Sequence, residues 1–439
     1  MKKIILPILM VSTLVFTGCL KDDDTPIIIE EVTIIQNGDG STSTTETVAV
    51  TGAITEDTTW TNDKIYELNQ KVVVDNGATL TIEAGTIIKG KPGTGSLASA
   101  LIIARGAKIN AEGTSTSPII FTSTSDNIDL GETAGTNLDE TNRGLWGGLI
   151  MLGNAPGSFK GDLVEVQIEG IPADDTFGLY GGTDAADNSG VLKYVSIRHG
   201  GALIGEGNEI NGLTLGGVGN GTVIENIEVM ANVDDGIEFF GGTVNAKNLL
   251  VWAQGDDGLD IDQAYSGTID NAVVALGAAS DHALEIDGPE GTSTGSFTIQ
   301  NLTLVGDLDT NNGEYADFRS KAMGTVKNVY AKGFKTSADV ELDNNAVAQN
   351  FLDGLITLEA WEIVGFDNSV FVEKGGCIDF CDDDIDGNEV YEANIILTPS
   401  FTDRAATWTT QVTEGAQTVG ATASEFSWTY AVIEGGLAL

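Results

Sequence analysis

Asp234-Asp235-Gly236-Ile237-Glu238-Phe239 recurs along the chain in two related copies, Asp256-Asp257-Gly258-Leu259-Asp260-Ile261 and Asp281-His282-Ala283-Leu284-Glu285-Ile286. Each copy ends in an alternation of apolar, acidic and apolar residues, which is typical of a strand with one buried side. The first two copies are 22 residues apart and contain no helical half, which fits one coil of a parallel β-helix. The sequence therefore predicts an all-β fold, a single-stranded solenoid of the parallel β-helix type, over residues 51–360.

A second series of residues has a similar period and predicts which positions stack. An Asn followed by an apolar-x-apolar step occurs at spacings of 22, 23, 30 and 27 residues, at Asn226, Asn248, Asn271, Asn301 and Asn328. Each coil of a β-helix adds the ordinary strand spacing of about 4.8 Å, so these amides would lie one above another. We expect a ladder in which each Asn side chain bonds the Asn above and below it.

Short strands punctuated by Gly recur through most of residues 70–360. They include Gly77 to Ile82, Ala104 to Ile109, Ser117 to Ser123, Trp146 to Pro156, Asp187 to Tyr194 and Phe240 to Lys247. These stretches resemble the coils of a large set of secreted bacterial lipoproteins with a right-handed parallel β-helix of the pectin-lyase-like fold. The resemblance implies a right-handed helix and an exported protein, but it brings no catalytic motif. More distantly, the coils resemble those of pectate-lyase-like enzymes, whose chemistry does not follow from the fold alone.

The first residues have the features of an export signal. Lys2 and Lys3 precede an apolar run, and Thr17-Gly18 stands directly before Cys19, which resembles a bacterial lipoprotein signal. We expect removal of residues 1–18, lipidation at Cys19, and a flexible acidic tether over residues 19–50. Lys21-Asp22-Asp23-Asp24 resembles an export tag for the outer leaflet. It predicts a protein that is lipid-anchored in the cell outer membrane and faces outward.

The charge balance excludes several classes of function. The 439 residues carry 21 basic and 65 acidic side chains, a net charge of −44. Nucleic acid is excluded as a partner, because no surplus of Lys and Arg is present to neutralise phosphates. With two His and three Cys, the chain is neither a zinc-finger nor a disulfide-scaffold protein. We expect no organic cofactor.

The outward positions of the repeat predict an acidic face. If Ile237 and Phe239 point inward, alternation places Glu238 and Phe240 outward. The same parity exposes Asp260 with Asp262, Glu285 with Asp287, Arg319 with Lys321, and Glu341 with Asp343. With the residues of the preceding turns, the candidate face comprises Asp234, Asp235, Glu238, Asp256, Asp257, Asp260, Asp262, Asp281, Glu285 and Asp287.

Three interpretations of this face stay open. Carboxylates about 4.8 Å apart repel by roughly 3.5 kcal/mol at an effective dielectric of about 20, but by under about 1 kcal/mol in bulk water. An exposed column is tolerable as a solvated ladder with cross-coil salt bridges from Arg319 and Lys321, and we favour this interpretation. A shielded column would have to bind a cation such as Ca²⁺ or hold a proton. As an enzyme, the face would pair two carboxylates near His199, His282 or Arg319; the sequence selects no pair, and we assign no catalytic residue.

A second candidate calcium site lies near the C-terminus. Asp382-Asp383-Asp384-Ile385-Asp386-Gly387 has the D-x-D-x-D-G spacing that brings three carboxylates to one hard cation. The expected ligands are Asp382, Asp384, Asp386, the backbone carbonyl of Asn388, and Glu392, which stands next to the usual twelfth position, Ala393. Cys377 and Cys381 lie just before this loop, and in an exported chain we expect them to form a local disulfide.

Residues 361–439 lose the repeat and are expected to cap the end of the solenoid, which would otherwise expose an unpaired edge. The most economical function is a non-catalytic binding, adhesion or assembly module that presents an acidic, calcium-stabilised face to a polysaccharide. One alternative is a polysaccharide lyase or glycoside hydrolase that uses the outward carboxylates. A second is an accessory subunit of an outer-membrane transport or secretion complex.

Overall fold

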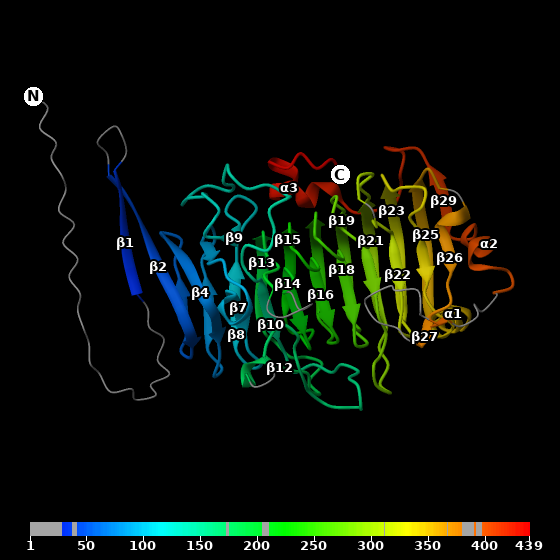
Figure 1. Ribbon diagram of the computed structural model, residues 1–439, viewed down its shortest axis with the longest axis horizontal. Helices are drawn as coiled ribbons and strands as arrows, with labels where there is room; N and C mark the ends of the chain where they lie inside the picture. The colour runs from blue at the N-terminus through cyan, green and yellow to red at the C-terminus, as the bar shows by residue number, and fades with distance from the viewer. Residues whose placement is uncertain are drawn as a thin grey trace, which may run out of the picture.

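The computed structural model describes residues 29–36, 42–172, 175–203, 210–310, 312–366, 368–379, 390–391 and 397–439. It confirms the right-handed parallel β-helix, whose coils stack along the long axis of the molecule (Figure 1). The predicted vertical neighbours are correct: Ile227 pairs with Leu249, and Leu249 pairs with Ala272 in the next coil. Within the described residues, no helix has the length and apolar character needed to cross a membrane.

Three stacks of parallel strands, here called sheets 1, 2 and 3, form the walls of the solenoid. One group of long strands bends in the middle, so that the first half lies in sheet 2 and the second half in sheet 1. These are β13 (Gly190–Arg198), β15 (Val223–Met230), β17 (Asn245–Trp252), β19 (Thr268–Ala275), β21 (Phe297–Val305), β23 (Gly324–Lys332) and β25 (Ile356–Val364).

Shorter strands complete the three stacks. Sheet 1 also contains β6 (Ile87–Gly90), β9 (Ile119–Ser123) and β29 (Thr409–Val412), and sheet 2 contains β3 (Thr58–Trp60), β5 (Thr79–Ile82) and β8 (Lys108–Glu112). Strand β4 (Lys64–Val74) contributes to sheets 1 and 3. Sheet 3 continues through β7 (Ala100–Ile103), β10 (Leu149–Leu152), β14 (Leu213–Gly216), β16 (Ile237–Phe240), β18 (Leu259–Asp262), β20 (Leu284–Ile286), β22 (Ala316–Phe318), β24 (Val340–Leu342) and β26 (Phe371–Glu373).

The inward side chains of all three sheets form one continuous core. In sheet 3, Leu259 and Ile261 of β18 are fully buried, and the same two positions of the neighbouring coils carry Ile237, Phe239, Leu284 and Ile286. The alternation that the sequence predicts is therefore correct. It also fixes which residues of sheet 3 point outward, between the buried ones.

The predicted Asn ladder is confirmed at the bend between sheets 2 and 1. Asn248 donates through Nδ2 to Asn226 Oδ1 at 2.9 Å, and Asn271 donates to Asn248 Oδ1 at 2.6 Å. The five ladder residues have φ between 56° and 64°, a left-handed conformation that Asn tolerates better than most residues. The ladder breaks once, because Asn301 Nδ2 donates to Asp270 Oδ1 instead of to Asn271. It resumes in the next coil, where Asn328 Nδ2 donates to Asn301 Oδ1 at 3.1 Å.

Part of the predicted tether is a pair of strands. In the structure, β1 (Ile29–Gln36) and β2 (Thr42–Ile54) pair antiparallel, and β2 pairs in parallel with β4 of the first coil. The edge of that coil offers unpaired backbone groups, which a neighbouring stretch of β-branched residues can satisfy. The solenoid therefore begins before residue 51. Residues 1–28, with the predicted signal and Cys19, lie outside the described residues.

The predicted boundary at residue 360 falls inside β25, and the coils continue through β26 and β29. Near this end, helix α1 (Asn345–Leu352) and helix α2 (Phe401–Ala405) bring Phe351 and Phe401 together, with ring centroids 4.9 Å apart. Phe401 also packs on Phe371 and Trp408. Helices α1 and α2 lie at the C-terminal end of the stack of coils (Figure 1), so these aromatic side chains close the core there.

The remaining residues, 415–439, do not cap the end. They form a strap that runs back along the outer side of sheet 1, with helix α3 (Tyr430–Ile433) over the middle coils (Figure 1). Thr418 bonds Glu362, and Thr422 N donates at 2.6 Å to Asn271 Oδ1, at the break in the ladder. The strap also covers an apolar outer patch of sheet 1 that includes Leu250, Trp252 and Val273, to which it contributes Phe426 and Ala431. Burial of this patch explains why the chain reverses direction here.

Helix α3 of the strap is held by a fully buried carboxylate, that of Glu228. Its oxygens accept the backbone N–H groups of Tyr430 at 3.1 Å and Ala431 at 2.8 Å, and the hydroxyl of Ser196 at 2.6 Å. The guanidinium of Arg198 lies 4.7 Å from the ring centre of Tyr430. These contacts satisfy the first backbone N–H groups of α3 and hold the strap on the solenoid.

We expect Asn248→Ala to lower the free energy of unfolding by about 1–3 kcal/mol, because it removes two ladder hydrogen bonds and leaves buried amides without partners. Asn248→Gly serves as the control for the positive φ, since Gly adopts this conformation without strain. Denaturant unfolding measures both variants. If Asn248→Gly were as stable as the wild type, the ladder would contribute nothing.

We expect Glu228→Ala to loosen the strap, because hydrogen bonds to a charged acceptor contribute about 1.5–3 kcal/mol each. Limited proteolysis should then cut within residues 415–439 at least about tenfold faster. Glu225→Ala is the matched control, since Glu225 is an exposed carboxylate of the same strand paired with Lys193 at 3.4 Å. Equal protection of the two variants would contradict this role of Glu228.

Candidate functional site

The outer side of sheet 3 carries a column of acidic residues in register. Glu238 pairs with Asp260, Asp260 with Glu285, Glu285 with Asp317, and Asp317 with Glu341. These five residues are only 5–9% exposed. The prediction that this column is exposed to solvent is therefore wrong. The column is shielded from solvent, so repulsion between its carboxylates is strong.

The sequence prediction also misplaced one member of the column. It carried the outward parity into this coil two residues too far along, and put Arg319 where the structure has Asp317. The alternation Ala316-Asp317-Phe318 matches Leu259-Asp260-Ile261 and would have identified the position.

A second acidic row comes from the turn before each strand. Asp235 Oδ1 accepts the backbone N–H of Asp257 at 2.9 Å, and Asp257 Oδ1 accepts that of His282 at 2.7 Å. Each side chain thus caps the turn of the next coil. The Gly that follows Asp235 has no room for a side chain, since a Cβ at Gly236 would lie 2.7 Å from the carbonyl oxygen of Gly258. The repeated Asp-Asp-Gly motif therefore holds the turns of successive coils together and also concentrates negative charge there.

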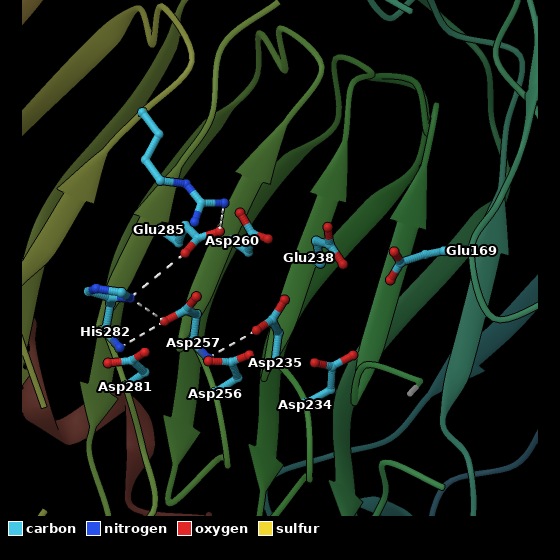
Figure 2. Close-up of a pocket in the computed structure, with 11 residues that line it drawn as sticks. Glu169, Asp234, Asp235, Glu238, Asp256, Asp257, Asp260, Asp281, His282 and Glu285 are labelled. Carbon is cyan, nitrogen blue, oxygen red and sulfur yellow. Dashed lines mark hydrogen bonds and ion pairs between the residues drawn. The ribbon is translucent and has the colours of Figure 1, made fainter. Parts of the chain in front are cut away.

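The two rows enclose a pocket of about 380 Å³ (Figure 2). Eight of the ten predicted residues line it, namely Asp234, Asp235, Glu238, Asp256, Asp257, Asp260, Asp281 and Glu285, together with Glu169, His282 and Arg319. Asp262 and Asp287 lie further along the strands and do not line it. Glu169 belongs to the loop between β11 (Val166–Gln167) and β12 (Leu179–Tyr180), outside the repeat, so no signal in the sequence pointed to it.

Burial and mutual repulsion raise the pKa values of carboxyl groups in and beside this pocket. Burial, with the charges of neighbouring carboxylates, raises the pKa of Asp235, Glu238 and Asp260 well above the ordinary values. The same causes raise the pKa of Asp256 to about 6 and that of Asp262 to about 7. At neutral pH the pocket therefore holds protons, or a cation that replaces them.

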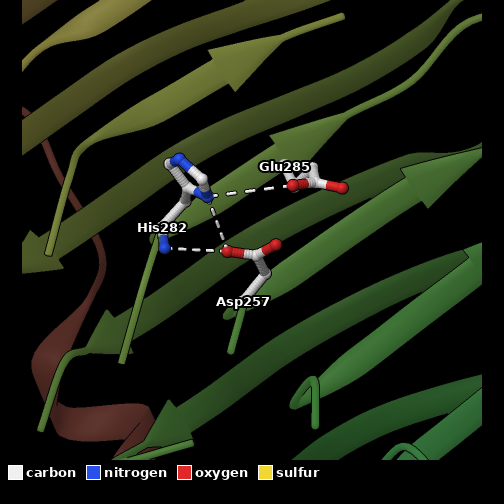
Figure 3. Close-up of side chains that lie close together, drawn as sticks. All are labelled: Asp257, His282 and Glu285. Carbon is white, nitrogen blue, oxygen red and sulfur yellow. Dashed lines mark hydrogen bonds and ion pairs between the residues drawn. The ribbon is translucent and has the colours of Figure 1, made fainter. Parts of the chain in front are cut away.

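His282 is the only imidazole of the pocket (Figure 3). Its Nδ1 lies 2.9 Å from Asp257 Oδ1 and 3.8 Å from Glu285 Oε2. Burial alone would lower the pKa of His282, but the hydrogen bond and charge of Asp257 outweigh it and raise the pKa to about 10. Burial also opposes the ionisation of Asp257, but the hydrogen bonds and charge of His282 outweigh it and lower the pKa of Asp257. Burial and the charge of Asp257 raise the pKa of Glu285 to about 10. Asp257 and His282 thus form an ion pair beside a protonated Glu285.

Arg319 neutralises the far end of the pocket. Its guanidinium donates to Asp287 Oδ2 through Nη2 at 2.7 Å and through Nε at 3.0 Å, and Nη2 also contacts Glu285 Oε1. The predicted cross-coil salt bridge of Arg319 is therefore correct. Its contacts leave the other end of the pocket, around Asp235, Glu238 and Asp260, more acidic.

Asp235, Glu238 and Asp260 have the geometry of a hard-cation site. One carboxylate oxygen of each lies within 4.8 Å of the others, the largest separation that two oxygens can have when both bind Ca²⁺ at about 2.4 Å. Glu238 accepts from Asn211 Nδ2, but Asp260 Oδ1 is buried and has no hydrogen-bond partner among the described residues. A buried carboxylate oxygen without a partner is costly, and a cation in the pocket would satisfy it.

The remaining predicted site residues lie either outside the described part of the chain or away from this pocket. Asp382, Asp384, Asp386, Asn388, Glu392 and Cys381 lie outside the described residues. Cys377 begins strand β27 (Cys377–Asp379), which pairs antiparallel with β28 (Val390–Tyr391), so the disulfide stays a prediction. His199 is buried on another sheet, where its Nδ1 lies 2.7 Å from Asn142 O. Trp146, Trp252 and Trp361 are buried, so none of them offers a face to a sugar ring.

We expect the metal-free protein to lose stability as the pH rises from about 5 to about 8. Asp256, Asp262, Asp317 and Glu314, with pKa values of about 6, 7, 7 and 8, hold their protons when folded but ionise near pH 4 when unfolded. Their contribution is therefore complete below about pH 4 and is lost as the pH passes through the folded pKa values. His282 acts in the same direction at higher pH.

Thermal unfolding in the presence of a chelator at pH 5, 6.5 and 8 measures this effect. The midpoint should fall by several degrees, Ca²⁺ should restore it at pH 8, and Asp262→Asn should flatten the pH dependence. A midpoint that rises over this range would contradict the assignment of raised pKa values.

The comparisons with known proteins agree with this architecture. A family model described as a pectate-lyase like beta helix domain matches residues 52–413, from near the end of β2 to just past the end of β29. A search of curated proteins found no match, and a search of solved structures found none. Because the family model covers most of the chain and the coils have its fold, the protein belongs to the pectate-lyase-like β-helix domain family.

Proposed function

We propose that the protein is a non-catalytic binding module in which the acidic pocket of sheet 3 takes up divalent cations, Ca²⁺ by preference, and through them binds a polysaccharide. The observation that carries the proposal is the concentration of nine carboxylates around one pocket, with only His282 and Arg319 as counter-charges. All of the acidic ligands are oxygen donors, the type that Ca²⁺ prefers.

A glycan ligand fits the chemistry of such a site. A hydrated Ca²⁺ ion keeps coordination positions that vicinal hydroxyls or a uronate carboxylate can fill. The pocket, at about 380 Å³, lies at the small end of ligand pockets, which span about 300–1,000 Å³. It therefore has room for an ion together with a single sugar ring. Without the ion, the excess negative charge would repel an acidic glycan.

The location of the protein belongs to the same proposal. A lipid on Cys19 would anchor the chain in the outer membrane, and the segment after it would carry the solenoid on the cell surface. There the protein would meet polysaccharides and the outer-membrane proteins that handle them. A calcium-bound loop at Asp382, Asp384 and Asp386 would add a second hard-cation site.

One observation favours an enzyme as the second candidate. Asp257, with a lowered pKa, and Glu285, with a pKa of about 10, lie side by side with His282. A carboxylate that stays ionised next to one that stays protonated is the arrangement of a base and an acid in glycoside hydrolysis. The ion pair with His282 accounts for the lowered pKa of Asp257, and burial beside the Asp257 charge accounts for the raised pKa of Glu285, without catalysis.

Calorimetric titration with Ca²⁺ tests the binding function. We expect the wild type to bind Ca²⁺, and Asp260→Asn to weaken binding at least about tenfold, equivalent to about 1.4 kcal/mol. Glu359→Gln is the control, since Glu359 is an exposed carboxylate of sheet 2. A glycan array probed with and without a chelator should show binding only when Ca²⁺ is present.

Two outcomes would overturn the proposal. The first is a wild-type protein that binds no Ca²⁺, or binds it no better than Asp260→Asn. The second is release of reducing sugars or unsaturated uronates from the glycans that bind, which would establish the enzyme instead.

A further inference from the structure

The acidic column continues past the pocket, toward the C-terminal end, into a cluster of different composition. His282 lies in the turn before β20, and Asp317 and Glu341 occupy the next two coils, on β22 and β24. One ligand atom of each lies within 4.8 Å of the others. Asp317 and Glu341 do not line the calcium pocket. We propose that His282, Asp317 and Glu341 form a second metal site, selective for a borderline transition-metal cation such as Zn²⁺.

An unsatisfied buried oxygen points independently to a ligand. Asp317 is only 5% exposed, and its Oδ1 has no hydrogen-bond partner among the described residues. One carboxylate oxygen of Asp317 lies within 4.8 Å of a ring nitrogen of His282 and of a carboxylate oxygen of Glu341. Native proteins rarely leave such an atom without a partner, and a metal ion between the three side chains would supply one.

The orientation of His282 suits metal binding. Asp257 Oδ1 occupies the Nδ1 side of the ring at 2.9 Å, and Nε2 points away from both Asp257 and Glu285 (Figure 3). Metal-binding His residues usually have one ring nitrogen held by a carboxylate or carbonyl, which fixes the ring and leaves the other nitrogen for the metal. Asp257 would therefore be a positioning residue, and Nε2 the ligand.

The donor set distinguishes this site from the oxygen-only pocket. One imidazole and two carboxylates match Zn²⁺, which binds nitrogen and oxygen at about 2.0–2.2 Å, whereas Ca²⁺ takes oxygen ligands almost exclusively. Small side-chain rotations would bring the three donors to these distances. Glu314 adds a further carboxylate nearby, since it groups with Asp339 and Glu341.

Lys374 is the internal competitor for this site. Its ammonium forms an ion pair with Glu341 Oε2, yet the Lys374 side chain is 44% exposed. It therefore supplies a positive charge to the metal-free site and can withdraw into solvent when a cation binds. Removal of this charge should favour the metal, which is the opposite of what a purely structural salt bridge predicts.

Titration with Zn²⁺ in the presence of saturating Ca²⁺ tests the inference on the full chain. We expect His282→Gln and Asp317→Asn each to weaken Zn²⁺ binding at least about tenfold, equivalent to about 1.4 kcal/mol. Lys374→Gln should tighten it several-fold, and Asp260→Asn and Glu359→Gln should leave it within about twofold of the wild type. Asp260→Asn thus separates failure of the calcium pocket from failure of this site.

Pulsed EPR of the protein loaded with Cu²⁺ gives a readout that folding alone would not change. The wild type should show the modulation of the remote imidazole nitrogen, and His282→Gln should lose it. The inference is overturned if the wild type binds no Zn²⁺ above the Ca²⁺ background, if the imidazole modulation persists in His282→Gln, or if Lys374→Gln binds Zn²⁺ more weakly.

Discussion

The structure depends on the hydrogen-bonded register between successive coils. Parallel pairing holds each residue directly over its equivalent in the next coil, as with Ile227, Leu249 and Ala272. Stacked apolar residues gain burial, and stacked amides gain hydrogen bonds, because an amide both donates and accepts. Stacked carboxylates only accept and repel one another, so they need a proton, a basic side chain or a metal ion. The Asn ladder and the acidic column are two results of one geometry.

The carboxylate column meets this need in different ways along its length. Toward the middle of the solenoid, Glu238 and Asp260 hold raised pKa values. Farther on, His282 and Arg319 supply positive charge to Asp257 and Asp287, and Glu285 has a raised pKa. Near the C-terminal end, Lys374 pairs with Glu341. The all-oxygen and the mixed nitrogen–oxygen clusters lie at different levels of the same column, which is why one sheet can offer sites to two kinds of cation.

The C-terminal strap shows how the solenoid compensates for irregular coils. The longer coil between Asn271 and Asn301 breaks the ladder, and Thr422 of the strap takes up the oxygen of Asn271 that the break leaves available. The strap also covers apolar residues on the outside of sheet 1, such as Leu250 and Val273. It thereby joins coils that are not neighbours in the stack, from Glu362 back to Glu228.

The sequence by itself determined the coil, its period, the inward and outward positions and the Asn ladder, because strand alternation and vertical stacking are local consequences of a repeat. It also identified eight of the residues that line the acidic pocket. Only the tertiary structure decided that this face is shielded, that Asp317 rather than Arg319 stands in the column, and that Glu169 lines the pocket. The strands within the expected tether and the strap over sheet 1 were likewise beyond the sequence. Burial, loop approach and pairing of chain ends depend on contacts between segments far apart in the chain, and a periodic pattern contains no information about them.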